Sequence, residues 1–124
     1  MKKILIIEDE ISLQKTLKDA LEREGYLVIC ASDGEEGIKL AKNEMPDLIL
    51  LDLILPKKDG LEVLEELRKD SRTQDISVIV LTNFESIASV EKAIELGVVN
   101  YLVKAQYTLD EVIQKIKSEI EKLK

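Results

Sequence analysis

The sequence predicts an α/β domain in which five parallel strands form one doubly wound sheet, in the order 2-1-3-4-5, with five helices on its two faces. Two features lead to this fold class. Short apolar runs alternate five times with segments of helical period along the 124 residues. The first, third and fourth runs are uninterrupted, which is typical of central strands, whereas the second and fifth are mixed, as at sheet edges. The length is that of one domain, so we expect residues 1–124 to fold as a single domain.

Each predicted strand is a short run rich in Ile, Leu and Val that ends at polar residues. Crossovers between parallel strands are right-handed. Because the predicted strand order reverses at strand one, such crossovers place helices on both faces of the sheet. In chain order the predicted strands are "KILII" (3–7), "YLVICA" (26–31), "LILLDL" (48–53), "ISVIVLT" (76–82) and "VNYLV" (99–103).

Helix start and stop signals bracket the segments between these strands. Gly25 and Gly97 are expected to end the first and fourth helices, because glycine readily adopts the left-handed conformation at a helix end. The predicted N-caps are Asp33 with Glu36 and Thr108 with Glu111, both at capping-box spacing, and Ser86. The predicted helices cover 11–24, 34–43, 61 to the polar segment at 68–75, 87–96 and 109–123.

Apolar residues at helical spacing predict the buried face of each helix. The third helix is marked by Leu61, Leu64 and Leu67. In the fourth the apolar residues at this spacing are Ile87, Val90, Ala93 and Ile94, and the stripe of the fifth is Val112, Ile113, Ile116, Ile120 and Leu123.

Composition excludes several classes of function. A net charge of -7 argues against direct nucleic-acid binding, which needs clustered Lys and Arg. The sequence has no histidine, so it has neither a His-based catalytic triad nor a His-ligated zinc. Cys30 is the only cysteine and is expected to pack as a small buried hydrophobe. No apolar run approaches the length of a membrane span or a secretory signal, and we expect a cytoplasmic protein with no membrane contact.

Acidic residues stand where two neighbouring strands are predicted to end. Glu8 and Asp9 follow the first strand, and Asp52 closes the apolar run "LILL" of the third. Ligands bind beyond the carboxyl ends of the strands at the point where strand order reverses, here between strands one and three. Crowded carboxylates repel one another unless protons or a cation relieve them, and oxygen ligands suit Mg²⁺, with Mn²⁺ as an alternative. The competing interpretation is three ordinary acidic residues in solvated loops.

A hydroxyl-bearing residue closes the fourth predicted strand and a cationic residue follows the fifth, at the same edge of the sheet as the carboxylates. Thr82 closes the fourth strand and Lys104 follows the fifth, although a lone lysine is more often a plain surface residue. Together with the carboxylates they form a set that can hold a phosphoryl group: Asp52 accepts it, the metal and Lys104 neutralise its oxygens, and Thr82 donates a hydrogen bond.

These motifs resemble the receiver domain of two-component response regulators, a flavodoxin-like fold that includes the single-domain chemotaxis regulator. The resemblance spans the chain, from "ILIIEDE" through "LILLDLILPKKDG" and "VIVLT" to "NYLVK". It implies a phosphoacceptor signalling domain, not an enzyme, which assists only its own phosphorylation and slow dephosphorylation. The implied roles are phosphoacceptor for Asp52, metal ligands for Glu8, Asp9, Asp52 and the backbone carbonyl of Ile54, switch hydroxyl for Thr82, phosphate-pairing cation for Lys104 and aromatic switch for Tyr101.

The resemblance also implies partners. A sensor histidine kinase or a His phosphotransfer protein supplies the phosphoryl group, and the surface of the fourth helix, fifth strand and fifth helix changes conformation in response. The output is then a downstream protein or a covalently linked output domain, and no output domain is expected in residues 1–124. We expect a monomer or a weak, phosphorylation-dependent dimer. The sequence identifies neither the kinase nor the target.

Four residues near the site depart from the family pattern or tune it. Asn83 replaces the usual small residue after the switch hydroxyl, where it narrows access to the phosphate or adds a hydrogen bond. Ala105 replaces the usual proline after Lys104, so a trans bond is expected there. Apolar Ile54 and Phe84 should exclude the attacking water and make the phosphorylated form long-lived.

Three other functions fit the topology less well. A haloacid-dehalogenase-type phosphohydrolase needs a second Asp two residues beyond the nucleophile, where this chain has Ile54. A nucleotide or flavin module needs a glycine- or hydroxyl-rich phosphate loop after strand one, where this chain has "EDEIS". A degenerate receiver that serves only for docking would not keep the whole set of site residues.

Overall fold

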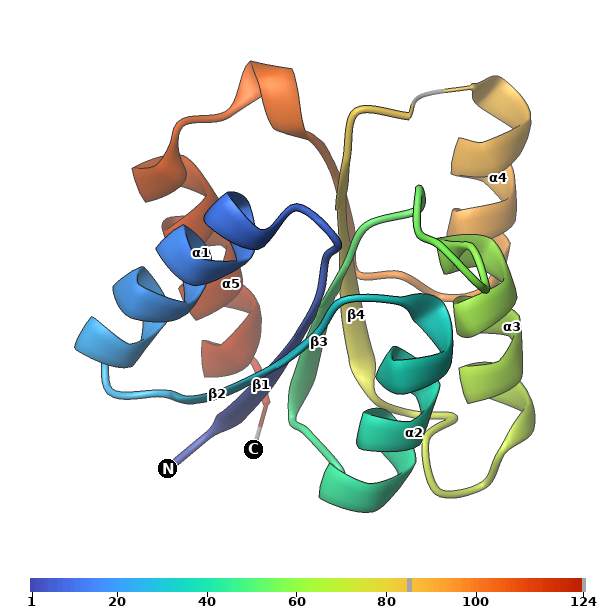
Figure 1. The fold of residues 1–124 in the computed structure, drawn as a ribbon, viewed down its shortest axis with the longest axis horizontal. Coiled ribbons are helices and arrows are strands. Elements are labelled where there is room, and N and C mark those ends of the chain that lie inside the picture. Colours follow the sequence, from blue (N-terminus) through green and yellow to red (C-terminus); the bar gives the residue numbers. More distant parts are fainter. Residues whose placement is uncertain (85, 124) are drawn as a thin grey trace.

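The computed structural model describes residues 1–84 and 86–123 and has the predicted sheet (Figure 1). All strand pairs are parallel and the order is β2-β1-β3-β4-β5, which confirms the prediction. The strands are β1 (Lys3–Ile7), β2 (Leu27–Ala31), β3 (Leu48–Leu51), β4 (Ser77–Thr82) and β5 (Asn100–Val103).

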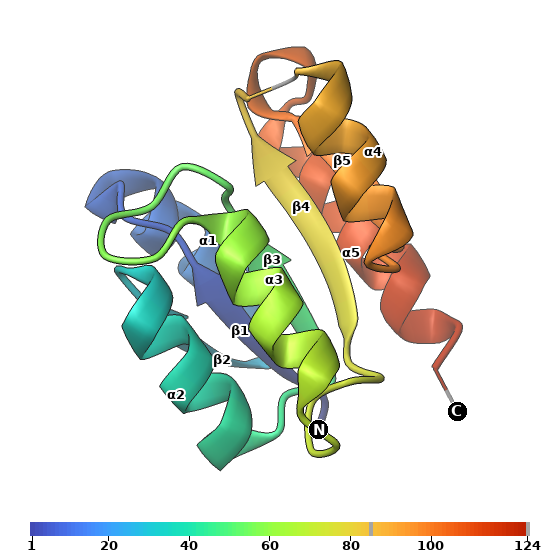
Figure 2. The same cartoon turned by 90° about the vertical axis from the view of Figure 1, so that its right-hand side faces the viewer.

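The helices cover both faces of the sheet, α1 and α5 on one side and α2, α3 and α4 on the other (Figure 1, Figure 2). The capping box at Thr108 and the stop signals at Gly25 and Gly97 are confirmed, since both glycines have positive φ. The helices are α1 (Ile11–Arg23), α2 (Gly34–Glu44), α3 (Gly60–Lys69), α4 (Ile87–Glu95) and α5 (Leu109–Glu121), with a 3-10 turn, η1 (Lys104–Gln106), after β5.

Two apolar layers hold the sheet between the helices. Along β1, Ile4 and Ile6 pack into the layer under α1 and α5, while Leu5 and Ile7 pack into the layer under α2, α3 and α4. Burial on both faces explains why the central strands read as uninterrupted apolar runs. Cys30, on the edge strand β2, is only partly buried, contrary to the expectation that it is a core residue.

The register of the central strands brings their carboxyl ends to one level. Ile7 of β1 pairs with Leu51 of β3, so the residues that follow them, Glu8 and Asp52, emerge side by side. The third strand, predicted over 48–53, ends earlier, at Leu51, so Asp52 lies just beyond β3.

The predicted capping box at the start of α2 is half right. The side chain of Asp33 accepts a hydrogen bond from the backbone N–H of Glu36, as expected of an N-cap. The Glu36 carboxylate, however, accepts the N–H of Ser32 at 2.8 Å and not that of Asp33. The glutamate thus satisfies a donor one residue further upstream, before the helix begins.

The predicted inner face of α4 is wrong in part. Ala93 is fully buried, but Ile87 is 78% exposed and Ile94 is 61% exposed. Ser89 and Ala93, four residues apart and therefore on one face of the helix, are the buried pair. Ile87 and Ile94, which fit the same helical period, lie on the opposite face and are mostly in solvent. The predicted stripe of the fifth helix is also too long, because α5 ends at Glu121 and Leu123 lies beyond it.

Arg68 fastens the carboxyl end of α4. Its guanidinium donates from Nε to the carbonyl of Leu96 at 2.7 Å and from Nη1 to that of Ile76 at 2.8 Å. Leu96 caps the carboxyl end of α4, where backbone carbonyls lack partners within the helix. A helix with only small residues in its buried face is in this way tied to the start of β4.

None of the helices among the described residues is both long and apolar enough to cross a lipid bilayer.

The burial pattern makes a stability prediction. Leu64 is fully buried in the layer under α3, so Leu64→Ala should lower the free energy of unfolding by about 2–5 kcal/mol. Ile94→Ala removes a side chain that lies mostly in solvent and should change it by less than about 0.5 kcal/mol. Urea denaturation measures both. A larger loss for Ile94→Ala than for Leu64→Ala would contradict the placement of α4.

Candidate functional site

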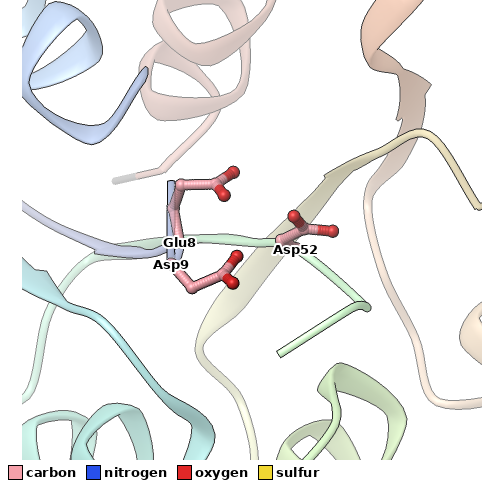
Figure 3. Close-up of side chains that lie close together, drawn as sticks. All are labelled: Glu8, Asp9 and Asp52. Carbon is pink, nitrogen blue, oxygen red and sulfur yellow. The ribbon is translucent and has the colours of Figure 1, made fainter. Parts of the chain in front are cut away.

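Three carboxylates converge at the carboxyl ends of β1 and β3 (Figure 3). Glu8 and Asp9 follow β1, Asp52 follows β3, and one oxygen from each lies within 4.8 Å of the others. Glu8 and Asp52 are buried, with 3% and 6% of their surface exposed, whereas Asp9 is open to solvent. The structure thus brings together the acidic residues that the sequence predicted, with an opening at Asp9.

Lys104 lies between the two buried carboxylates. Its Nζ is 2.8 Å from Glu8 Oε1 and 2.9 Å from Asp52 Oδ2. The lysine begins the η1 turn directly after β5, so it crosses the mouth of the sheet from the far edge. It is therefore a paired, largely buried cation and not a plain surface lysine.

Backbone N–H groups hold the remaining carboxylate oxygens. Glu8 Oε2 accepts the N–H of Glu10 at 3.0 Å, and Asp52 Oδ1 accepts the N–H of Ile54 at 3.1 Å. These bonds fix the direction of both carboxylates. The role of the Ile54 carbonyl oxygen as a metal ligand stays a prediction.

The electrostatics of the site leave negative charge uncompensated. Burial, with the nearby Asp52 charge adding to it, raises the pKa of Glu8 above its usual 4.5 despite the hydrogen bond from Lys104. For Lys104, burial works to lower the pKa, but the hydrogen bonds to Glu8 and Asp52 outweigh it and the pKa is raised. One ammonium against three carboxylates leaves two negative charges, and clustered carboxylate oxygens of this number suit a hard divalent cation.

The predicted switch residues, Thr82 and Tyr101, both bond to the loop that follows β4. Thr82, the last residue of β4, is fully buried, and its hydroxyl oxygen accepts the N–H of Phe84 at 3.2 Å. The Tyr101 hydroxyl donates to the carbonyl oxygen of Phe84. Both side chains thus bond to the same residue of the loop that follows β4.

Asn83 and Ala105, the two departures from the family pattern, are bonded to each other. The side-chain oxygen Oδ1 of Asn83 accepts the backbone N–H of Ala105 at 3.1 Å. Within residues 1–84 and 86–123 no peptide bond is cis, so the trans bond predicted before Ala105 is confirmed.

Sequence analysis missed Gln14, which supports the end of β1. Its side-chain amide donates to the carbonyl oxygens of Glu8 at 2.9 Å and Ala31 at 3.2 Å. Gln14 lies on α1 and so ties this helix to the point where Glu8 and Asp9 leave the sheet. In the sequence, the only sign of this role is a long polar side chain, and such side chains are equally common on solvated helix faces.

Comparison with known proteins agrees with this geometry. The family model described as "response regulator receiver domain" matches residues 4–117. The chain belongs to this family. A receiver domain protein described as CheY-like, from Methanospirillum hungatei, is 30% identical with a TM-score of 0.91, and the match covers 98% of this chain and 95% of that one. The fold is accordingly the flavodoxin-like receiver fold that the sequence predicts.

Two further relatives are informative. A probable transcriptional regulator, ycf27 of Guillardia theta, is 45% identical over 102 residues, which cover 82% of this chain and 39% of the relative. The structure of the Mn²⁺-bound response regulator Rcp1 is 33% identical with a TM-score of 0.81, covering 95% of this chain and 93% of that one. The receiver spans less than half the length of the curated relatives it matches.

The raised pKa of Glu8 predicts a pH dependence. A carboxyl group with a higher pKa in the folded than in the unfolded chain favours folding while it is protonated, so without divalent cations stability should fall as pH rises from about 4.5 through that pKa. Glu8→Gln should flatten this decline and be more stable than wild type at pH 7.5 in EDTA. Denaturant unfolding across pH measures it, with Glu10→Gln as the exposed control. Equal pH profiles for Glu8→Gln and wild type would contradict the conclusion that burial raises the pKa of Glu8.

Proposed function

We propose that this receiver accepts a phosphoryl group onto Asp52 from a phosphohistidine of a partner protein, in the presence of Mg²⁺, and signals by a change in the surface formed by α4, β5 and α5. The observation that carries the proposal is the position of Asp52, clustered with two other carboxylates and paired with Lys104 at the carboxyl ends of the strands. Membership of the receiver family supports the same chemistry.

The transfer is an in-line displacement. An Asp52 carboxylate oxygen attacks phosphorus, the P–N bond to the donor histidine breaks, and the imidazole leaves with the bond's electron pair. Glu8, Asp9 and Asp52 would hold Mg²⁺, which would neutralise charge on the phosphoryl oxygens. Lys104, already within hydrogen-bond distance of Asp52 Oδ2, pairs with another phosphoryl oxygen. Mn²⁺ suits the same oxygen ligands, and the relative Rcp1 is described as binding it.

Conformational change then begins at Thr82. Its hydroxyl turns to donate a hydrogen bond to the phosphoryl group. This rotation pulls on the loop after β4, because Thr82 and Tyr101 are both hydrogen-bonded to Phe84 in that loop. The phosphorylated side chain carries roughly -1.5 to -2 charges where the Asp52 carboxylate carried about one, and this added charge shifts the population between two arrangements of that loop. Tyr101 acts as the aromatic switch on this path.

The partners follow from the chemistry. By the receiver family's mechanism the donor is a sensor histidine kinase or a His phosphotransfer protein, and the absence of histidine from this chain is consistent with an external donor. Residues 1–124 act as one receiver domain, and the output is a downstream protein or a covalently linked output domain, as the longer relatives named as transcriptional regulators suggest. The cytoplasmic location, the absence of direct nucleic-acid binding and the weak dimer stay predictions.

Phosphorylation by a small donor tests this function. With acetyl phosphate and Mg²⁺, wild type should gain the mass of one phosphoryl group, and Asp52→Asn should gain none, as measured by intact mass spectrometry. Asp59→Asn is the matched control, since Asp59 caps α3 nearby and asparagine serves as well as an N-cap. An unmodified wild type, or an Asp52→Asn variant modified as fully as wild type, would refute the proposal.

The lifetime of the phosphorylated form is predicted to be long. Ile54 and Phe84 line one hollow of about 240 Å³ together with Leu53, Leu55, Leu61 and Asp59, and neither of these two apolar side chains can orient a water for attack. Ile54→Asn combined with Phe84→Glu should speed loss of phosphate by about 10²-fold or more at constant Mg²⁺, because a positioned polar group assists proton transfer from water. Ile94→Asn, a polar change at an exposed isoleucine remote from the hollow, should leave the decay unchanged. Equal decay of all three proteins would remove this explanation.

A further inference from the structure

Among the described residues a hydrogen bond joins the loops after β4 and β5: Asn83 Oδ1 accepts the backbone N–H of Ala105 at 3.1 Å. Asn83 directly follows Thr82, and Ala105 directly follows Lys104. The bond therefore links the two residues that stand next to the proposed switch hydroxyl and the phosphate-pairing lysine. Both residues are otherwise exposed, so neither is held in place by burial.

Before Lys104 the backbone is fixed in β5, where Val103 pairs with Thr82, but after it the restraints are weaker. Lys104 begins the three-residue η1 turn, whose closing backbone bond, from the N–H of Tyr107 to the carbonyl of Lys104, is long at 3.4 Å. From this turn the Lys104 ammonium reaches back to both Glu8 and Asp52. A fixed point at the next backbone N–H restricts where the lysine's Cα lies and so where its ammonium is presented.

The two residues form a matched pair. A proline at 105 has no N–H, so Asn83 would lose its donor, and a small residue at 83 would leave the Ala105 N–H to water. Each departure from the family pattern is thus chemically useful only in the presence of the other. A proline restrains the backbone after the lysine through its ring, whereas this chain restrains it through a side chain of the neighbouring loop.

We propose that Asn83 is a positioning residue for Lys104, and that its bond to Ala105 holds the lysine ready for a phosphoryl group and couples it to the loop of the switch hydroxyl. The proposal rests on the proposed phosphoacceptor function. In this proposal Asn83 contacts neither the phosphate nor the metal. A substitution of Asn83 should therefore change only the binding of the phosphoryl group that Lys104 pairs with.

The test uses beryllofluoride as the phosphoryl surrogate, with the folded protein in excess Mg²⁺. Asn83→Ala should weaken beryllofluoride binding about fivefold, the worth of one ordinary hydrogen bond, while the affinity for Mg²⁺ alone stays that of wild type. Exchange of the Ala105 amide hydrogen, followed by NMR, should accelerate by a similar factor. Asn43→Ala, at an exposed asparagine on α2, is the matched control and should change none of the three quantities.

A double-mutant cycle tests the pairing itself. Ala105→Pro removes the donor, so adding Asn83→Ala to it should cause no further loss of beryllofluoride affinity. Additive losses would overturn the proposal, as would an Asn83→Ala variant that binds beryllofluoride like wild type or loses Mg²⁺ affinity to the same extent. If Ala105→Pro fails to fold, amide exchange and affinities of Asn83→Ala decide alone. A wild type that binds no beryllofluoride would instead refute the phosphoacceptor function.

Discussion

The arrangement of the site depends on one ion-pair network, in which the Lys104 ammonium bonds to both buried carboxylates at under 3 Å. Removing two carboxylates from water is costly, and one cation shared between them compensates only part of that cost. The same lysine holds Asp52 at the mouth of the sheet and fixes the end of β5 against the ends of β1 and β3. The exposed Asp9 adds further negative charge on the open side of the cluster.

The parallel register of the sheet places the two buried carboxylates of this network next to each other. Parallel register places Glu8 and Asp52 beside each other because Ile7 and Leu51 are paired, and both apolar layers lock that register. Helix α4 has few buried side chains among the described residues and is tied at its carboxyl end by Arg68, while its amino end adjoins the loop of Asn83 and Phe84. The site is thus built on strands that are packed on both faces, whereas α4 is held by few buried side chains.

The fold and the acidic cluster could be predicted because each depends on a strong local signal. Uninterrupted apolar runs identified the central strands, and Asp52 stood out as a carboxylate at the end of one of them. Side-chain orientation in α4 could not be predicted, because Ile87 and Ile94 fit a helical period as well as Ser89 and Ala93 do and only tertiary packing chooses between the faces. Bonds across distant loops, such as that of Asn83 with Ala105, leave no pattern in sequence.

The central claim is that the charge left over by Lys104 is balanced by a divalent cation bound at Glu8, Asp9 and Asp52. The most direct measurement is the free energy of unfolding as a function of Mg²⁺ concentration, at pH 7.5 and constant ionic strength set with NaCl. Specific binding to the folded chain should raise it by about 2.7 kcal/mol at a hundred times the dissociation constant, and Asp9→Asn should reduce this gain. A curve in Mg²⁺ identical to that in NaCl alone would contradict the account.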